Sequence, residues 1–434
     1  MIPFARISSY GNKLAAPELK KMDFGGALKN SNTDGNYFGA VLMSTGKLYG
    51  FGLYISSIFG ITESASNNNT ISFSLDNVDN FWLMMNGILV RTIGGLMLYR
   101  GKYLDGIFCP NSLSSTPYIT SGWLDVTSYF STVGVDILDV ACTGNYPDNI
   151  NLQSRAASCS LFVLSSSGVV YGMGYNDQLL ISPTGTGDIY TEFTTIGISG
   201  VSSLRSTPYM THNNSKISRC VLYALKSDGS VWGRGYNVRS GIRNPAFAEY
   251  VTTWTNIAVN TPIYAFSSDT EGAIYSTSTD IYLIGAAGYN TYNMGLASSG
   301  YSTVNTTGGF FNRTLSYREI GGSTDIPFTS TKYVNSSTRI RMNYGGSVIF
   351  TKGSSEIFTA HGQYSDSSIA ANIYFYREDI GIPVQDIIYL SQLFNTNSVT
   401  NVRGLLVLGT DGNFYVRGII NGTLYNTFTK INFL

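Results

Sequence analysis

Few residues of this chain have the type and spacing that catalysis or metal binding requires. Its 434 residues include two histidines, His212 and His361, and neither has a cysteine or carboxylate partner at metal-ligand spacing. No Gly-x-Ser-x-Gly nucleophile elbow is present. The neighbouring carboxylates Glu378 and Asp379 follow no catalytic pattern, although a pair of carboxylates could still meet across the fold. We therefore expect a protein that is not an enzyme and that uses no metal and no cofactor.

Closely spaced glycines, as in Gly50-Phe51-Gly52 and Gly233-Arg234-Gly235, could indicate a phosphate-binding loop. Such a loop needs a helix N-terminus or an equivalent nest of backbone N–H groups. Here the glycines instead belong to a unit of strand, tight turn and strand, and this unit recurs along the chain. We therefore do not expect phosphate binding and interpret the glycines as parts of an internal repeat.

Seven copies of the unit align on a turn glycine or its equivalent, and in five of them a second glycine follows six residues later, as in Gly229 and Gly235. The second position after the turn is apolar in every copy, and the third is aromatic in six, as in Val231 and Trp232. Adjacent side chains of a strand point to opposite faces, so these strands are expected to be covered on both faces, as in stacked propeller blades. The expected hairpins centre near residues 46, 95, 168, 229, 279, 355 and 412.

A further strand is expected upstream of the hairpins, for example over residues 192–196, 253–257 and 331–334. The final residues 427–433 match this element. We therefore expect the ring to be closed by N- and C-terminal strands that share a sheet, which would remove an exposed edge.

The repeats run through the chain without a break, so a single domain over residues 1–434 is expected. No convincing helical period is present. The spacing between hairpins varies, and the excess length is assigned to three inserted loops, at 102–122, 286–328 and 361–383.

The repeat resembles that of the regulator-of-chromosome-condensation family of seven-bladed β-propellers. The likeness is strongest where a Tyr-Asn pair follows the second glycine, as in Tyr175-Asn176 and Tyr236-Asn237. It extends over residues 20–434, although the Gly-Gln-Leu-Gly that continues the family motif is only partly kept. The resemblance implies an all-β, seven-bladed propeller. It implies little about function, because such propellers serve as exchange factors, scaffolds and binders.

Charge and hydropathy exclude several functional classes. The formal net charge is +0 and basic residues occur in pairs rather than patches, so no nucleic-acid partner is expected. Arg339 and Arg341 would share one face of a strand, which we expect to be solvated. No apolar run approaches the roughly 20 residues of a membrane span, and no signal peptide is apparent, so we expect neither membrane insertion nor Sec-type export. Cys159 and Cys220 occupy one repeat position and are expected to be buried.

The inserted loops are rich in aromatic residues separated by Asn, Ser, Thr and Gly. Tyrosine offers a large amphipathic contact area at low entropic cost, and the small polar residues offer adaptable hydrogen bonds. The alternative is that individual aromatic side chains pack the loops onto the propeller. As a set, they are predicted to form a receptor-binding surface made of Tyr289, Tyr292, Tyr301, Phe310, Phe311, Tyr317, Tyr364, Tyr374, Phe375 and Tyr376.

Low charge, abundant Tyr, Asn, Ser, Thr and Gly, and degenerate repeats are similar to the composition of bacteriophage adhesion proteins. We therefore expect a receptor-binding protein at a phage tail tip, assembled in the host cytoplasm and carried on the virion. Its expected partners are a host outer-membrane protein and other tail proteins. Two alternatives remain open: an intracellular scaffold or GTPase exchange factor, and a glycan-binding propeller.

Overall fold

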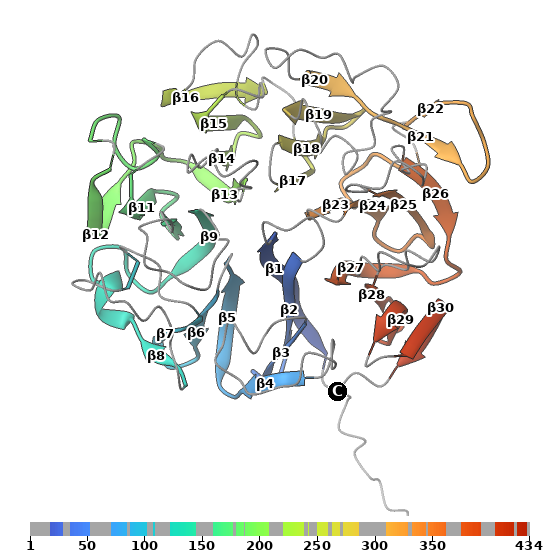
Figure 1. Ribbon diagram of the computed structural model, residues 1–434, viewed down its shortest axis with the longest axis horizontal. Helices are drawn as coiled ribbons and strands as arrows, with labels where there is room; N and C mark the ends of the chain where they lie inside the picture. Colours follow the sequence, from blue (N-terminus) through green and yellow to red (C-terminus); the bar gives the residue numbers. More distant parts are fainter. Residues whose placement is uncertain are drawn as a thin grey trace, which may run out of the picture.

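Seven β-sheets stand like blades around a central axis in the computed structural model of the chain (Figure 1). The predicted all-β, seven-bladed propeller is therefore confirmed. The structure describes residues 18–28, 35–52, 71–84, 87–101, 107–108, 122–144, 159–176, 179–185, 187–207, 220–237, 242, 250–258, 263–269, 272–285, 310–328, 332–343, 346–361, 375–391, 404–420 and 423–431.

The first strand of each blade lies nearest the axis (Figure 1). These inner strands are β1 (Leu19–Leu28), β5 (Val78–Leu83), β9 (Ile137–Gly144), β13 (Val201–Ser206), β17 (Ala265–Asp269), β23 (Thr338–Asn343) and β27 (Val384–Ser391). The second strands are β2 (Gly35–Met43), β6 (Gly87–Thr92), β10 (Cys159–Ser165), β14 (Val221–Lys226), β18 (Gly272–Ser276), β24 (Gly346–Thr351) and β28 (Gly404–Gly409).

The third strands complete the repeated hairpins. They are β3 (Leu48–Gly52), β7 (Met97–Gly101), β11 (Val170–Tyr175), β15 (Val231–Tyr236), β19 (Ile281–Gly285), β25 (Glu356–His361) and β29 (Phe414–Ile420). The outer strands are β4 (Ile71–Leu75), β8 (Leu124–Asp125), β12 (Ile189–Thr195), β16 (Tyr250–Ala258), β20 (Phe310–Thr314), β26 (Phe375–Asp379) and β30 (Thr423–Ile431). A short 3₁₀ helix, η1 (Thr127–Phe130), links β8 to β9.

Each repeated unit is an antiparallel pair of a second and a third strand, as the glycine pattern predicts. The turn glycines need the left-handed conformation; Gly229, for example, has φ of 83°. The apolar position after each turn is buried in every blade. The aromatic position is half-buried in all but Phe358, which is fully buried, so the two positions face different neighbours as expected.

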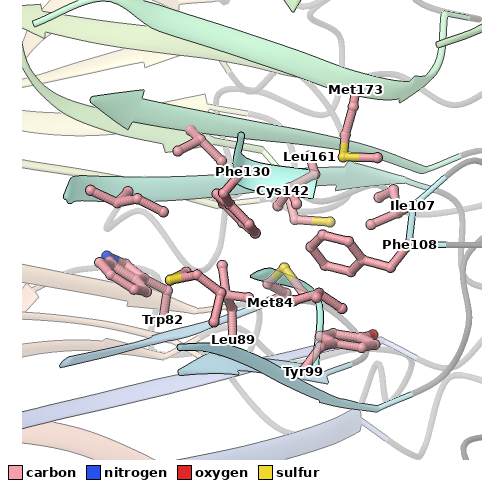
Figure 2. Packing of buried hydrophobic residues seen from close by; sticks show 14 of the residues in the cluster. Trp82, Met84, Leu89, Tyr99, Ile107, Phe108, Phe130, Cys142, Leu161 and Met173 are labelled. Atoms are coloured by element: carbon pink, nitrogen blue, oxygen red, sulfur yellow. The ribbon is translucent and has the colours of Figure 1, made fainter. Parts of the chain in front are cut away.

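The hydrophobic core lies between blades rather than in one centre. The cluster drawn in Figure 2 joins side chains of the β5–β8 and β9–β12 sheets, among them Trp82, Leu89, Leu161 and Met173. Phe108 also enters this cluster, with its ring 5.3 Å from that of Tyr99. Part of the insertion predicted at 102–122 is thus anchored in the core. Cys220 is fully buried, as predicted.

The ring closes differently from the prediction. Each of the seven described sheets is built from one continuous run of strands along the chain, and β30 pairs with β29 while β1 pairs with β2. The first and last blades instead meet face to face through apolar side chains such as Val41, Met43, Ile388 and Leu406. Each blade already has four strands of its own, so no shared sheet is needed.

The strands expected upstream of the hairpins also need correction. Residues 192–196 and 253–257 fall largely within β12 and β16, which are the outer strands of the preceding blades. The described residues 332–334 lie outside any strand. The true inner strands were missed because they carry polar side chains toward the axis and lack both a glycine turn and a long apolar run.

The predicted insertion at 286–328 is not a loop throughout. Residues 310–314 form β20, and the chain then crosses to the next blade as β21 (Ser316–Glu319) and β22 (Ile326–Pro327). β21 runs parallel to β26 and pairs Tyr317 with Phe375, which makes this sheet six-stranded. Residues 375–379 of the insertion predicted at 361–383 are likewise the strand β26.

Candidate binding face

The two ends of the propeller differ in how the strands are connected. The end that carries the seven hairpin turns is called the turn face, and each of these turns has four residues, as in 44–47 and 227–230. At the opposite end the third strands lead into the outer strands. This end is called the insertion face, because strand ends there flank segments as long as 53–70, 102–123 and 286–309.

Asn176 organises the described segment at the insertion end of β11. Its side chain is fully buried, and its amide nitrogen donates to the backbone oxygens of Ser182 and Thr184 at 3.1 and 2.9 Å. Its oxygen accepts the backbone N–H groups of Ile181 and Ser182. A single side chain thus satisfies backbone groups of a segment that has no sheet partner.

Asn237 occupies the same position after β15. It too is fully buried, and its side-chain oxygen accepts the N–H of Ile242 at 2.9 Å, with the five-residue separation found between Asn176 and Ile181. The Tyr-Asn pairs that carry the family resemblance therefore hold the bases of two insertion-face segments.

Arg234 ties these two regions together. Its guanidinium is almost fully buried and donates to the backbone oxygen of Leu179 through Nε and a terminal nitrogen, at 3.0 and 2.7 Å. Burial lowers the pKa of Arg234 to about 10. Leu179 has φ of 53°, a left-handed conformation that is uncommon for leucine and that these bonds support. The insertion face therefore has a rigid base between these two blades.

The structure separates the ten residues of the predicted receptor-binding surface. The predicted surface role is wrong for Tyr317 and Phe375, because both side chains are buried in strands. Tyr317 packs against Phe328, Tyr333 and Phe358. Their spacing gave no sign of this, because the pairing of β21 with β26 joins distant parts of the chain. Tyr376 is half-buried on β26.

The other members of that set are less fully placed. Phe310 and Phe311 lie in β20, and only their backbone belongs to the described part of the structure. The remaining five fall outside the described residues: Tyr289, Tyr292, Tyr301, Tyr364 and Tyr374. They belong to the segments 286–309 and 362–374, and the strand ends that flank both segments lie on the insertion face.

A second feature, missed from the sequence, is a belt of alternating charges on the inner strands. It consists of Arg205, Asp139, Lys21, Asp23, Arg341 and Asp386. Arg341 donates to both carboxylate oxygens of Asp386, at 2.8 and 3.1 Å. Arg341 is thus held in an ion pair rather than on the solvated face expected for it and Arg339.

The belt joins blades. Asp139 on β9 accepts hydrogen bonds from Ser203 Oγ, the Leu204 N–H and Arg205, all on β13. Lys21 on β1 donates to Asn80 Oδ1 on β5 at 3.1 Å. Burial lowers the pKa of Lys21, whereas Asp386 and Asp23 outweigh the effect of burial on Arg341 and raise its pKa. Opposite charges alternate in the belt and are hydrogen-bonded to other protein groups. We therefore infer that the belt stabilises the closed ring.

Within the described ranges, the other candidates for chemistry are not brought together. Among the described residues no group of three or more His, Cys, Asp or Glu could hold a metal ion. His361 ends β25 and His212 lies outside the described residues. Glu378 pairs with Arg417, and Asp379 accepts the N–H of Gly381. No helix in the described part of the chain is long and apolar enough to cross a membrane.

Comparisons with known proteins agree on the fold alone. No protein-family model matches the sequence, and no curated protein matches it either. Human WBSCR16 is similar in structure, with a TM-score of 0.55 and 14% identity, over 85% of this chain and 84% of that one. Prp20p from Saccharomyces cerevisiae, characterised for its binding to Gsp1p and histones, has a TM-score of 0.51 and 12% identity, over 84% and 79%.

The match to a fucose-specific lectin from Aleuria aurantia covers 96% of both chains, with 9% identity. Its TM-score of 0.34 is too low to support an inference. The chain therefore has the fold of the regulator-of-chromosome-condensation-like propellers. At these identities the likeness extends to architecture and not to activity.

Proposed function

We propose that this protein is a non-enzymatic propeller that binds a protein partner on its insertion face. The observation that supports this proposal is the difference between the two ends. All seven hairpin turns are short, whereas the longest segments all start and finish at strand ends of the insertion face. Long connections on a rigid scaffold are where binding residues concentrate.

The chemistry of those segments suits a protein surface. Five of the tyrosines predicted to bind a receptor lie in 286–309 and 362–374. On the same face, in the two blades that precede those segments, Asn176, Asn237 and Arg234 hold the base by buried hydrogen bonds. A fixed base lowers the ordering cost that binding must overcome, and tyrosines then supply contact area.

For the partner, the finer hypothesis is a bacterial surface protein, with this protein at the tail tip of a bacteriophage. Its support is compositional: few charged residues, 31 tyrosines and 47 glycines. In this hypothesis the insertion face points toward an outer-membrane protein, and the opposite face is available to other tail proteins.

A second candidate is an intracellular scaffold or GTPase exchange factor. The observation in its favour is the structural similarity to Prp20p, a protein studied with its partner Gsp1p. The neutral net charge of the present chain gives no sign of a basic surface for a nucleic-acid partner. Acceleration of nucleotide release from a small GTPase would distinguish this candidate.

The test compares one insertion-face variant with a turn-face control. The variant replaces Tyr289, Tyr292 and Tyr301 with serine, and the control is Tyr264→Ser, which alters an exposed tyrosine between β16 and β17. Binding of labelled protein to a panel of bacterial cells is measured by flow cytometry, before and after surface proteolysis. Nucleotide release from small GTPases is measured in parallel.

We expect protease-sensitive binding that falls about a hundredfold in the triple variant, since hot-spot aromatics dominate interfaces, and that is unchanged in Tyr264→Ser. Equal binding by both variants would place the contact elsewhere. Binding that survives proteolysis but is lost after periodate oxidation of the cells would identify a glycan. Nucleotide release without cell binding would support the exchange factor.

A further inference from the structure

The outer strand of each blade has one edge that faces the rim of the propeller, and most of these edges are irregular. Register shifts interrupt the pairing of β4, β12, β16, β20 and β30 with their third strands, and β8 has only two residues. A bulge bends and twists an edge strand, so a further strand pairs with it poorly. Six of the seven outer strands are thus protected by a bulge or by their shortness.

The remaining outer strand, β26, is regular. It pairs with β25 at four successive positions without a register shift. Its other edge is covered by β21, which runs parallel to it and pairs from Tyr317 with Phe375 to Glu319 with Arg377 (Figure 1). Among the described strands, no other outer strand carries a further strand on its rim edge. The regular edge is therefore also the covered one.

The chain uses extra length to cover this edge. Elsewhere, the connection from an outer strand to the next inner strand takes 2 to 11 residues, as in 76–77, 380–383 and 126–136. Between β20 and β23 the connection has 23 residues, 315–337, and it contains β21 and β22. Because a few residues suffice to join neighbouring blades, the added length is accounted for by the two strands that cover β26.

A buried anchor and two ion pairs hold the covering strands in place. Tyr317, near the start of β21, is buried in the aromatic cluster described above. Beyond this anchor, the Glu319 carboxylate lies 3.1 Å from the Arg377 guanidinium on β26. Arg318 pairs with Asp325, just before β22, at 2.7 Å. The half-buried residues that follow the anchor thus cover the middle of β26 without belonging to the core.

We propose that β21 and β22 form an edge guard, which keeps β26 from pairing with β26 of a second copy of the chain. A regular strand with a free edge is a template for such pairing. The sequence of β26 suits a second copy, because two antiparallel β26 strands can place Arg377 of one opposite Glu378 of the other. Opposite charges directly across two strands attract each other. The guard therefore prevents self-association at the rim of this blade.

A pair of proline substitutions in the full-length chain tests the proposal. Arg318→Pro/Glu319→Pro removes two N–H groups from β21 and alters no fully buried side chain. The matched control is Thr191→Pro/Glu192→Pro, which makes the same change in the exposed bulge of β12. Sedimentation velocity at low and high protein concentration measures association. Hydrogen exchange in β26 measures whether its edge is covered.

In Arg318→Pro/Glu319→Pro at low concentration, we expect exchange in β26 to become at least about tenfold faster, because the edge is uncovered. At high concentration this variant should form a dimer, and exchange in β26 should slow again. The β12 control should match the wild type in both measurements. Adding Arg377→Glu to the β21 proline pair should abolish the dimer, because like charges then face each other across the two strands.

A β21 variant that stays monomeric at high concentration while β26 exchanges fast would overturn the proposal. Unchanged exchange in β26 would also overturn it, because pairing with β21 would then not be what covers the edge. The same holds for a dimer in which β26 still exchanges fast. If the proline pair fails to fold, Arg318→Gly/Glu319→Gly, which keeps the N–H groups but weakens the strand, decides by the same measurements. Receptor binding is not measured, so failure here leaves the proposed function intact.

Discussion

At the turn face every hairpin closes through four residues, whereas at the insertion face strands of the same blades are connected by segments of up to 24 residues, 286–309. Both faces belong to the same strands and share one core. The difference arises because a turn between a second and a third strand fixes their register, while the path from a third to an outer strand leaves room for insertion.

The two faces also satisfy their polar groups differently. Hydrogen bonds within the four-residue turns are local and exposed, as between Asp411 and Asn413, two residues apart. At the insertion face, Asn176 is buried and bonds to backbone groups of its own segment, and the buried Arg234 bonds to a backbone oxygen 55 residues away. The bonds of Arg234 therefore depend on the assembled ring, and three substitutions test the contrast between the two faces in order of decreasing effect.

The largest difference in unfolding free energy is expected between alanine substitutions at two repeat glycines, Gly235 and Gly412. Gly235, at the insertion end of β15, has φ of 121°, and an added Cβ would meet the Cys220 oxygen and lie 2.8 Å from Leu180 Cδ2. Gly235→Ala should lower the free energy of unfolding by about 3–4 kcal/mol through overpacking and backbone strain. Urea denaturation monitored by tryptophan fluorescence measures this.

The control for that change is Gly412→Ala on the turn face. Gly412 has φ of 76° but nothing within 4 Å of an added Cβ, so only the backbone conformation is penalised, by about 1 kcal/mol. Equal losses in the two variants would show that close packing at the insertion end contributes nothing.

The next effect concerns the buried asparagines. Asn176→Ala strips hydrogen bonds from several buried backbone groups and should cost about 3 kcal/mol, whereas Asn413→Ala, in an exposed turn, should cost less than about 0.5 kcal/mol. Hydrogen exchange should rise at the N–H groups of Ile181 and Ser182, the donors to Asn176. Unchanged exchange there would contradict the assigned role of Asn176.

The smallest effect is a pH dependence at the turn face. Hydrogen bonds from the Tyr415 hydroxyl and from Asn413 lower the pKa of Asp411 from 3.8 to about 2. Because the folded pKa is depressed, the stabilisation is present above about pH 4 and is lost as the pH falls toward 2. For this mostly exposed group, solvent screening limits the effect to less than about 1 kcal/mol.

The measurement is the urea midpoint at pH 5 and at pH 2.5. The wild type should lose slightly more stability between the two than Asp411→Asn does, because the variant has no carboxylate to protonate. A larger loss in the variant would reverse the sign and rule out this hydrogen-bonded turn as the cause.

Much of the fold follows from local patterns. The hairpins were predictable because their strands pair across four residues, so an apolar run and, in six of the seven turns, a glycine with positive φ specify the pair without reference to the rest of the chain. The buried role of Cys220 and the packing role of Trp232, whose side chain lies half-buried against the cluster around Leu222, followed from repeat positions.

Other features depend on segments that are distant in sequence. The inner strand Val201–Ser206 carries serine and arginine, and Ser203 and Arg205 find a partner in Asp139 of the neighbouring blade. Tyr317 and Phe375 had the composition of binding-loop residues, yet a parallel pairing across 58 positions buries both.

The sequence by itself determined the repeating hairpin, the number of blades and the absence of recognisable catalytic spacing, because each depends on residue types within a few positions. Only the tertiary structure decided how the ring closes, which charges meet at its axis and that the long segments attach at one face. Those properties depend on which blades become neighbours, and neighbours are set by packing over the whole chain rather than by local spacing.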